Sequence, residues 1–383
     1  MILRTSLCCC AILFLVRCGQ PSGSAGDSTK TTGEKHASAA VELSDPGATS
    51  LAGTLFRNMA ELSADHVLLA HQDALAYGMG WKGEPFRTDI HDVTGDHPAV
   101  FGWDLGHIDS LENIDGVPFA DIKKWAMAAY EQGGLNTYSW HMRNYASGGT
   151  SWDTASCVTA CLPGGRIHKE YLKKLDRAAD FFSDLVNEQG ECIPVIFRPF
   201  HEMNGGWFWW GSASCTPDQY RELFRFTIDY LRNEKEQHQL IIAYSPDLFR
   251  SPEEYLTWYP GDRYVDVMGF DDYKGLNRKD RTHLTISMLE TVDSLSTVHG
   301  KLTAISETGV ETIPDEHWFT GVVLPTLKHS ASTRRVSWIL FWRNGRPDHF
   351  YAPYPDHPAA PDFRNFMEDT LMLSLSELPS MYQ

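Results

Sequence analysis

The sequence lacks any excess of positive charge. It contains 33 lysine and arginine residues against 50 aspartate and glutamate residues, which gives a formal net charge of −17. This balance argues against nucleic acid or another polyanion as a partner, and it is consistent with a neutral substrate.

The sequence also lacks an internal repeat, and no change of composition after Ala40 marks a second domain. At 383 residues the chain is longer than most single domains. Barrels of alternating strands and helices nevertheless run from roughly 200 to over 400 residues as one unit. We therefore expect residues 46–383 to form one folded domain.

The N-terminal segment has an apolar run, Ala11 to Val16, that is too short to span a bilayer. Arg4 precedes it, a pattern typical of an export signal. The stretch Leu15 to Gly19 resembles a bacterial lipoprotein cleavage box, in which Cys18 would become the lipidated first residue, although Arg17 stands where a small residue is expected. We predict a signal peptide over residues 1–18 and a cell-envelope lipoprotein, periplasmic or on the outer surface. Simple secretion is the alternative.

Residues 19–45 are predicted to be a flexible linker. The stretch from Gly19 to Ala40 is rich in Gly, Ser and Thr and nearly free of apolar side chains, a composition that cannot build a core. Contact with a membrane is expected only through the N-terminal lipid anchor.

Eight cysteines are present, four of them in the N-terminal segment. Cys157 and Cys161 share a loop and form a possible short disulfide in an exported protein. A zinc site that joins this pair to His168 is a weaker alternative, because no second close pair of Cys or His completes four ligands. Whether Cys192 and Cys215 pair or stay free is left open by the sequence.

Short apolar runs that end in polar or aromatic residues recur along the chain, between amphipathic stretches. The expected strands are His66 to Gln72, Ala99 to Asp104, Leu135 to His141, Ile193 to Glu202, Leu240 to Pro246, Val265 to Asp271, Leu302 to Glu307 and Val336 to Trp342. The expected helices are Thr54 to Leu62, Phe119 to Tyr130, Lys169 to Glu188, Asp218 to Glu236, Leu284 to Val298 and Phe363 to Leu373. Eight strands alternating with helices predict an α/β fold, the (β/α)8 TIM barrel, with a doubly wound open sheet as the alternative.

The most informative stretch is VIFRPFHEMNGGWFWWG, from Val195 to Gly211. Its apolar start has the character of a buried strand, but it ends in His201, Glu202 and Asn204, which do not belong in a core. Aromatic side chains follow from Trp207 onward, and flat rings suit the faces of sugars. The stretch therefore indicates a sugar site, although a solvated glutamate and a tryptophan core would be the plainer interpretation.

A second carboxylate occupies the same kind of position. Leu302 to Ile305 is another short apolar run, and it ends in Ser306 and Glu307. Hydrolysis of a glycosidic bond usually needs two carboxyl groups, one as acid/base and one as nucleophile or base. The pair Glu202 and Glu307 therefore predicts a glycoside hydrolase.

The combination of RPFHEMNGGWFWWG, a later SETG strand end and the GFDDY between them resembles glycoside hydrolase family 26, best known as β-mannanases. The resemblance covers the chain from about Leu51 to the C-terminus. It implies a (β/α)8 barrel and a retaining double-displacement mechanism, with Glu202 as acid/base and Glu307 as nucleophile. It implies neither a metal nor an organic cofactor.

The same resemblance suggests roles for residues around this pair. His201 and Asn204 would hydrogen-bond the reacting ring, Tyr273 would orient the nucleophile, and Asp271 would bind sugar, although Asp272 could exchange with it. His141, Trp342 and Arg343 would hold the sugar before the cleaved bond. Trp207 would form the wall near the leaving side, and Trp152 could stack a more distant sugar. The expected partner is a β-mannan polysaccharide or a manno-oligosaccharide.

Two other interpretations stay open. Members of the resembling family also cleave β-1,3-1,4-glucans and β-1,3-xylans, and the shared motifs do not separate these substrates. A catalytically silent glycan-binding lipoprotein would keep the aromatic residues, but it would have no reason to keep both glutamates.

Overall fold

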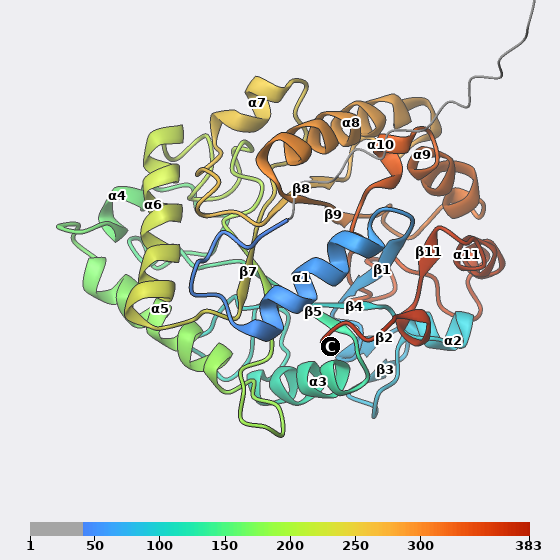
Figure 1. Ribbon diagram of the computed structural model, residues 1–383, viewed down its shortest axis with the longest axis horizontal. Helices are drawn as coiled ribbons and strands as arrows, with labels where there is room; N and C mark the ends of the chain where they lie inside the picture. The colour runs from blue at the N-terminus through green and yellow to red at the C-terminus, as the bar shows by residue number, and fades with distance from the viewer. Residues whose placement is uncertain (1–40) are drawn as a thin grey trace, which may run out of the picture. The chain divides into compact units, whose positions relative to one another are not determined.

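The computed structural model describes residues 41–383, in which eight parallel strands close into a barrel (Figure 1). The barrel strands are β1 (Val67–Gln72), β4 (Val100–Asp104), β5 (Leu135–Trp140), β6 (Val195–Pro199), β7 (Leu240–Tyr244), β8 (Val267–Asp272), β9 (Leu302–Thr308) and β10 (Trp338–Phe341). Each pairs with the next, and β10 pairs with β1 to close the ring. The predicted (β/α)8 barrel is confirmed, with all eight expected strands.

The signal peptide over residues 1–18, its lipidated Cys18 and most of the linker over residues 19–45 lie outside the described residues. The described part includes the last residues of that linker. Asp45 is buried, and its carboxylate lies 2.9 Å from Nδ1 of His238. Within residues 41–383 no helix is both long enough and apolar enough to cross a bilayer.

Helices cover the outside of the barrel. They are α1 (Ser50–Leu62), α2 (Asp89–Thr94), α3 (Phe119–Glu131), α4 (Val158–Cys161), α5 (His168–Ser183), α6 (Pro217–Asp229), α7 (Pro252–Thr257), α8 (Thr282–His299), α9 (Leu324–Leu327), α10 (Ala331–Arg334) and α11 (Ala360–Met367). Short π or 3-10 turns lie at η1 (Tyr230–Glu234), η2 (Lys279–Arg281), η3 (Phe319–Val323) and η4 (Leu375–Glu377). The expected helix start at Pro217 is found, where Thr216 and Gln219 form a reciprocal capping box.

The end of the expected last helix differs. Instead of continuing to Leu373, α11 stops at Met367, and β11 (Met372–Leu373) pairs in parallel with the start of β1. The apolar side chains of 371–373 are therefore used at a sheet edge and not on a helix face. A two-stranded hairpin, β2 (Tyr77–Gly78) with β3 (Trp81–Lys82), follows β1.

Two apolar layers hold the barrel together. Inside the ring lie side chains such as Leu68, Val100, Ile196, Ile241 and Trp338, and α1 adds Leu55, Phe56 and Met59 to the same cluster. Figure 1 shows α1 crossing the ring. A larger layer packs between the strands and the outer helices. Because the strands are buried on both faces, their sequences are nearly continuous apolar runs until they reach the carboxyl end.

Candidate functional site

A cleft of about 400 Å³ lies at the carboxyl ends of the barrel strands. One side of this carboxyl-end cleft consists of residues that follow β5 and β6, namely His141, Trp152, His201, Glu202, Trp207 and Phe208. The other consists of residues at or beyond the ends of β8, β9 and β10, namely Tyr273, Asn277, Glu307, Glu311, Trp342 and Tyr351. Catalytic groups of barrel enzymes gather at this end of the strands.

The cleft brings Glu202 and Glu307 together from distant parts of the chain. Carboxylate oxygens of Glu202, Asp271 and Glu307 all lie within 4.8 Å of one another. Glu307 belongs to β9, opposite Asp271 of β8, where the register of the two strands shifts. One oxygen of each glutamate thus lies within 4.8 Å of one oxygen of the other, close enough for the short carboxyl spacing, roughly 5–5.5 Å, that permits a covalent glycosyl intermediate.

Glu202 stands in an unusual backbone conformation. Its φ is 52° and that of Phe200 is 54°, in the left-handed region that side-chain-bearing residues rarely occupy. The amide of Glu202 donates to the carbonyl of Ser245 at 2.8 Å, which holds this turn against β7. Strained backbone of this kind persists where its surroundings fix it, and it gathers at functional sites.

The carboxyl group of Glu202 is set up to hold a proton near neutral pH. Burial, then the negative charge of Glu307, then that of Asp247 raise its pKa to about 7. The Trp207 indole opposes this, because its Nε1 donates to Oε2 of Glu202 at 2.6 Å and so favours the charged form. One of the two carboxyl groups is thereby prepared to act as an acid.

Arg198 organises the other carboxylate. This buried guanidinium on β6 donates to Oε1 of Glu307 and, from Nη1, to Oδ2 of Asp271 at 2.9 Å. Tyr273 donates from its hydroxyl to Oε2 of Glu307 at 3.1 Å. Two donors therefore fix the position of the Glu307 carboxyl group. Sequence reasoning considered Arg198 only as a possible ion-pair partner of Glu202. Its place inside an apolar strand was the signal for a buried charge partner.

Asp271 and Asp272 have different surroundings. Asp271 faces the cleft pair, and burial raises its pKa well above the usual range while Arg198 opposes that effect. Asp272 accepts from the amide of Gly275 at 2.6 Å and from the hydroxyl of Thr285 at 2.5 Å, so it braces the loop after β8. Of the two, only Asp271 faces the two glutamates.

Two histidines, His141 and His201, line the cleft together with Glu202 and Glu307. Nδ1 of His141 lies 2.7 Å from Oδ2 of Asp104, and Nε2 of His141 lies 3.2 Å from Nε2 of His201. Burial disfavours a charge on His141, but Asp104, together with Glu307 and Asp115, outweighs burial and raises the pKa of His141. Burial, with Arg198 and His141, lowers the pKa of His201 well below its usual range. Asp104 was not singled out from the sequence, although its position as the polar last residue of an apolar strand was a signal.

Aromatic rings line the cleft, but not all of those expected. Trp152 is half exposed and stacks on His141 at 5.4 Å between ring centroids. Trp207, Phe208 and Trp342 also line the cleft. In contrast, Trp209 and Trp210 are fully buried and belong to the outer apolar core.

Three expected sugar contacts, Asp271, Asn204 and Arg343, do not line the cleft, and Asp271 is fully buried. The amide of Asn204 donates to the carbonyls of Asp247 at 3.1 Å and Leu248 at 2.9 Å, so it is used to hold the loop after β7. Arg343 pairs with Asp115 at 2.9 Å and donates to the hydroxyl of Tyr77 at 3.3 Å.

Three cleft residues, Asn277, Glu311 and Tyr351, were missed, because they come from loops whose paths the sequence does not reveal.

The four cysteines within residues 41–383 form no disulfide. Sγ of Cys157 and Sγ of Cys161 lie 3.6 Å apart, and Cys192 and Cys215 are also free. His168 contacts the carbonyl of Cys161 with Nδ1 at 2.7 Å, which does not place it as a ligand with the two thiols. The possible disulfide is thus not formed here. Within residues 41–383 the one group with the donors of a metal site is Glu202, Asp271 and Glu307, and Arg198 already neutralises part of its charge.

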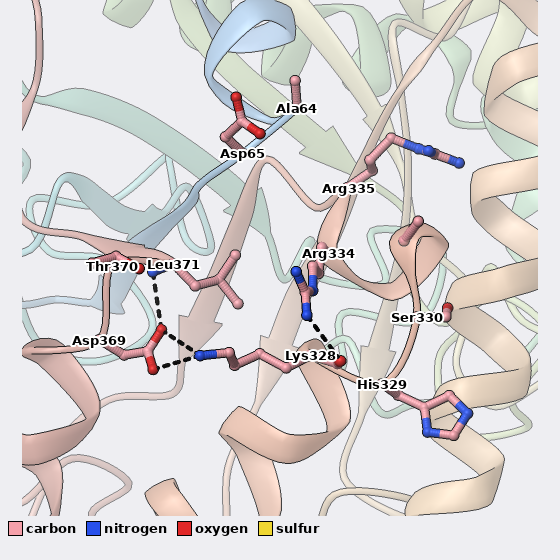
Figure 2. A pocket seen from close by; sticks show the side chains of 11 residues that line it. Ala64, Asp65, Lys328, His329, Ser330, Arg334, Arg335, Asp369, Thr370 and Leu371 are labelled. Atoms are coloured by element: carbon pink, nitrogen blue, oxygen red, sulfur yellow. Dashed lines mark hydrogen bonds and ion pairs between the residues drawn. The ribbon is translucent and has the colours of Figure 1, made fainter. Parts of the chain in front are cut away.

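A larger hollow of about 520 Å³ lies at the opposite end of the barrel (Figure 2). This amino-end pocket is formed by residues 64–65, 328–331, 334–335 and 369–371, several of which directly precede β1, β10 and β11. Lys328 is neutralised there by Asp369 at 2.7 Å, and Arg335 by Asp293. Size alone would select this pocket, but it contains no pair of interacting buried carboxyl groups.

The chain is similar in sequence and in fold to known glycoside hydrolases. The sequence pattern of glycosyl hydrolase family 26 matches residues 44–316. Mannan endo-1,4-beta-mannosidase of Bifidobacterium adolescentis is 30% identical over 363 residues, which cover 88% of this chain and 36% of that protein. The structure of a GH26 beta-mannanase from Bacteroides ovatus is 38% identical with a TM-score of 0.84, over 88% of this chain and 98% of that one. A modular endo-beta-1,4-mannanase from Cellulomonas fimi is 31% identical with a TM-score of 0.84, over 90% of this chain and 79% of that one.

The chain spans 36% to 53% of the length of the first curated relatives that it matches. The similarity therefore covers only part of each of those proteins.

Proposed function

Because the chain belongs to glycosyl hydrolase family 26, we propose that residues 46–383 are a catalytic domain that hydrolyses β-1,4-mannosidic bonds in mannan, galactomannan or glucomannan. The observation that carries this proposal is the pair of carboxyl groups within 4.8 Å in one cleft. The substrate is inferred from the relatives, among them a mannan endo-1,4-beta-mannosidase and a beta-mannanase.

The proposed reaction is a double displacement with retention. Glu307, held by Arg198 and Tyr273, attacks the anomeric carbon as a carboxylate, and Glu202 gives its proton to the leaving glycosidic oxygen. Glu202, now a carboxylate, then takes a proton from the water that attacks the glycosyl-enzyme bond, and Glu307 is released. The pKa of about 7 suits Glu202 to both steps near neutral pH.

The sugar whose bond is cleaved would lie among His141, His201 and Trp342 in this proposal, and Asp271 would act indirectly, through Arg198. Trp207 would contact the leaving portion, and the exposed ring of Trp152 would stack a sugar further along the cleft. Asn204 and Arg343 would act indirectly, through the loops that they hold.

A product time course tests the substrate and the mode of attack. The chain would be incubated with mannan, galactomannan, glucomannan and mixed-linkage β-glucan, and the released sugars separated by length. Proton NMR of the first product reports its anomeric form, which retention predicts to be β. A first product with the α form, or release from the mixed-linkage glucan alone, would refute the proposal.

We also propose that the protein is exported and held at the cell envelope by a lipid on Cys18. The support is the resemblance of Leu15 to Gly19 to a lipoprotein cleavage box. Replacing Cys18 by Ser should move the protein from the membrane fraction to the soluble fraction. Continued membrane association of this variant would contradict lipidation at that residue, and a soluble wild-type protein would favour simple secretion.

A further inference from the structure

The loops after β6, β7 and β8 meet at one point behind Glu202. Asn204, two residues after Glu202, donates to the carbonyls of Asp247 and Leu248, and its own Oδ1 accepts from the amide of Asp247 at 2.8 Å. The loop that carries Glu202 is thereby fixed to the loop after β7. The side chain of Asp247 remains available for a different partner.

That partner is Lys274, in the loop after β8. Nζ of Lys274 donates to Oδ2 of Asp247, whose side chain is only 9% exposed. The amide of Lys274 donates to Oδ1 of Asp272 at 3.0 Å, and Asp272 is itself held by Thr285. The ion pair therefore joins two braced loops, and its carboxylate is nearly removed from water.

Lys274 also contacts the indole that binds Glu202. Its Nζ lies 5.4 Å from the centre of the Trp207 ring, within the range of a cation–π interaction. Gly205 lies so close to the same ring that a Cβ there would stand 2.4 Å from Cη2 of Trp207. The indole is therefore held by a backbone contact and a cation while its Nε1 donates to Glu202.

We propose that the Asp247–Lys274 ion pair is a positioning element for the carboxyl group of Glu202, acting through the indole of Trp207 and through the charge that it places beside the acid. The inference rests on the proposed role of Glu202 as acid/base. Lys274 and Asp247 are positioning residues, because neither lines the carboxyl-end cleft.

The charged groups around Glu202 determine the direction in which each substitution should shift its pKa. Arg198 of β6, Asp271 of β8, Tyr273 directly after β8 and Glu307 of β9 all interact with Glu202. Asp247 adds its charge from the loop after β7. Asp247 raises the pKa of Glu202, after burial and Glu307. Lys274 offsets that charge. Removal of Lys274 alone should therefore raise the pKa of Glu202, and removal of Asp247 alone should lower it.

Four variants separate charge from structure. Lys274→Met leaves the charge of Asp247 without a partner. The midpoint of the alkaline limb of the kcat/KM profile should therefore shift to higher pH, by roughly half a pH unit. Asp247→Asn removes the negative charge and keeps the shape, so the limb should fall by a similar amount. The double variant removes both charges and should return the limb toward that of the wild type, while Lys274→Arg keeps the cation and should also resemble it.

Lys279→Met is the matched control. Lys279 is exposed in η2, five residues from Lys274, and the substitution changes the net charge of the protein by the same amount. It should not move the limb. Circular dichroism of each variant at the assay pH checks that the fold is kept.

The same titration can be followed without catalysis. In protein labelled with ¹³C at glutamate carboxyl carbons, the Glu202 signal is assigned by its loss in Glu202→Gln, and its midpoint should shift as the limb does. Shifts in the same direction for the two single variants, or shifts no larger than the control, would overturn the inference. If the midpoints shift as expected but no glycan is cleaved by the wild type, the inference about the carboxyl group stands and the proposed hydrolysis fails.

Discussion

The two ends of the barrel both carry a hollow, yet they differ in what they bury. The amino-end pocket is the larger, at about 520 Å³ against 400 Å³, and the ion pairs at it, Lys328 with Asp369 and Arg335 with Asp293, each include a partly exposed cation. The carboxyl-end cleft instead buries Arg198, Asp271 and Glu307 around a carboxyl group whose pKa is about 7. Paired surface charges stabilise little, whereas crowded buried ones change proton affinities. Buried charge, and not volume, identifies the site.

The strongest way to break this comparison is to remove the carboxylates of the cleft. Glu307→Ala should lower hydrolysis of mannan and of an activated aryl mannoside by at least about 10³-fold, because no covalent intermediate can form. Glu202→Ala should lower mannan hydrolysis by about 10²–10⁴-fold but spare formation of the intermediate from the aryl substrate, whose leaving group needs no proton. Initial rates on both substrates measure this. Equal losses on both would contradict the assignment of roles.

A second test measures how the buried carboxyl group of Glu202 changes the free energy of unfolding. Its folded pKa of about 7 lies above the unfolded value, so its contribution to stability is fully present at low pH and is lost as the pH rises through 7. Glu202→Gln should therefore be more stable than the wild type at pH 8, on the order of 2 kcal/mol, with the difference shrinking below about pH 5. Urea unfolding at both pH values measures the free energies. A variant that is less stable at pH 8 would contradict the buried carboxyl group.

The alkaline limb of wild-type kcat/KM should lie near pH 7 for the same reason, because only protonated Glu202 can act as the acid. A limb well above this value would show that another group donates the proton.

Removing the charge of Asp104, which contacts His141, should have a smaller effect on activity. Asp104→Asn removes the charge that raises the pKa of His141 and changes its hydrogen bond, so kcat/KM should fall on the order of tenfold to a hundredfold. The pH profile of the variant should change together with its rate. Ser139→Ala removes another hydrogen bond to Asp104 without changing the charge and serves as the control.

The smallest effect is expected at the amino end. Asp369→Ala breaks the pair with Lys328, which should cost about 0–1 kcal/mol of stability and leave mannan hydrolysis unchanged. Thermal unfolding and initial rates measure the two quantities. A large loss of activity from this substitution would mean that the two ends are coupled and that the comparison is false.

The strands and the two glutamates could be predicted because both depend on local pattern. Eight apolar runs ended in polar residues, and Glu202 and Glu307 stood at two of those ends. What could not be predicted depends on the direction of side chains after the strand. Asn204 follows two residues with positive φ, and its amide binds backbone carbonyls beside the cleft. Trp209 and Trp210 belong to the same aromatic run as Trp207, but they face the core.

Glu311 and Tyr351 could not be predicted for a different reason. They reach the cleft from loops fixed by contacts across the fold, such as the amide of Tyr351 donating to Oδ1 of Asn344 at 3.0 Å. No local periodicity encodes such contacts, so a sequence alone does not reveal which loop residues enter the cleft.

Closure of the ring depends on its last strand. The family pattern ends at residue 316, whereas β10, which joins β9 to β1, spans Trp338–Phe341. A protein trimmed to the matched span would retain both glutamates in its sequence, but β1 and β9 would be left as open edges with unpaired backbone groups. During synthesis, the ring can be completed only after the ribosome has passed residue 341, so the two carboxyl groups are gathered late and nearly the whole chain is needed to gather them.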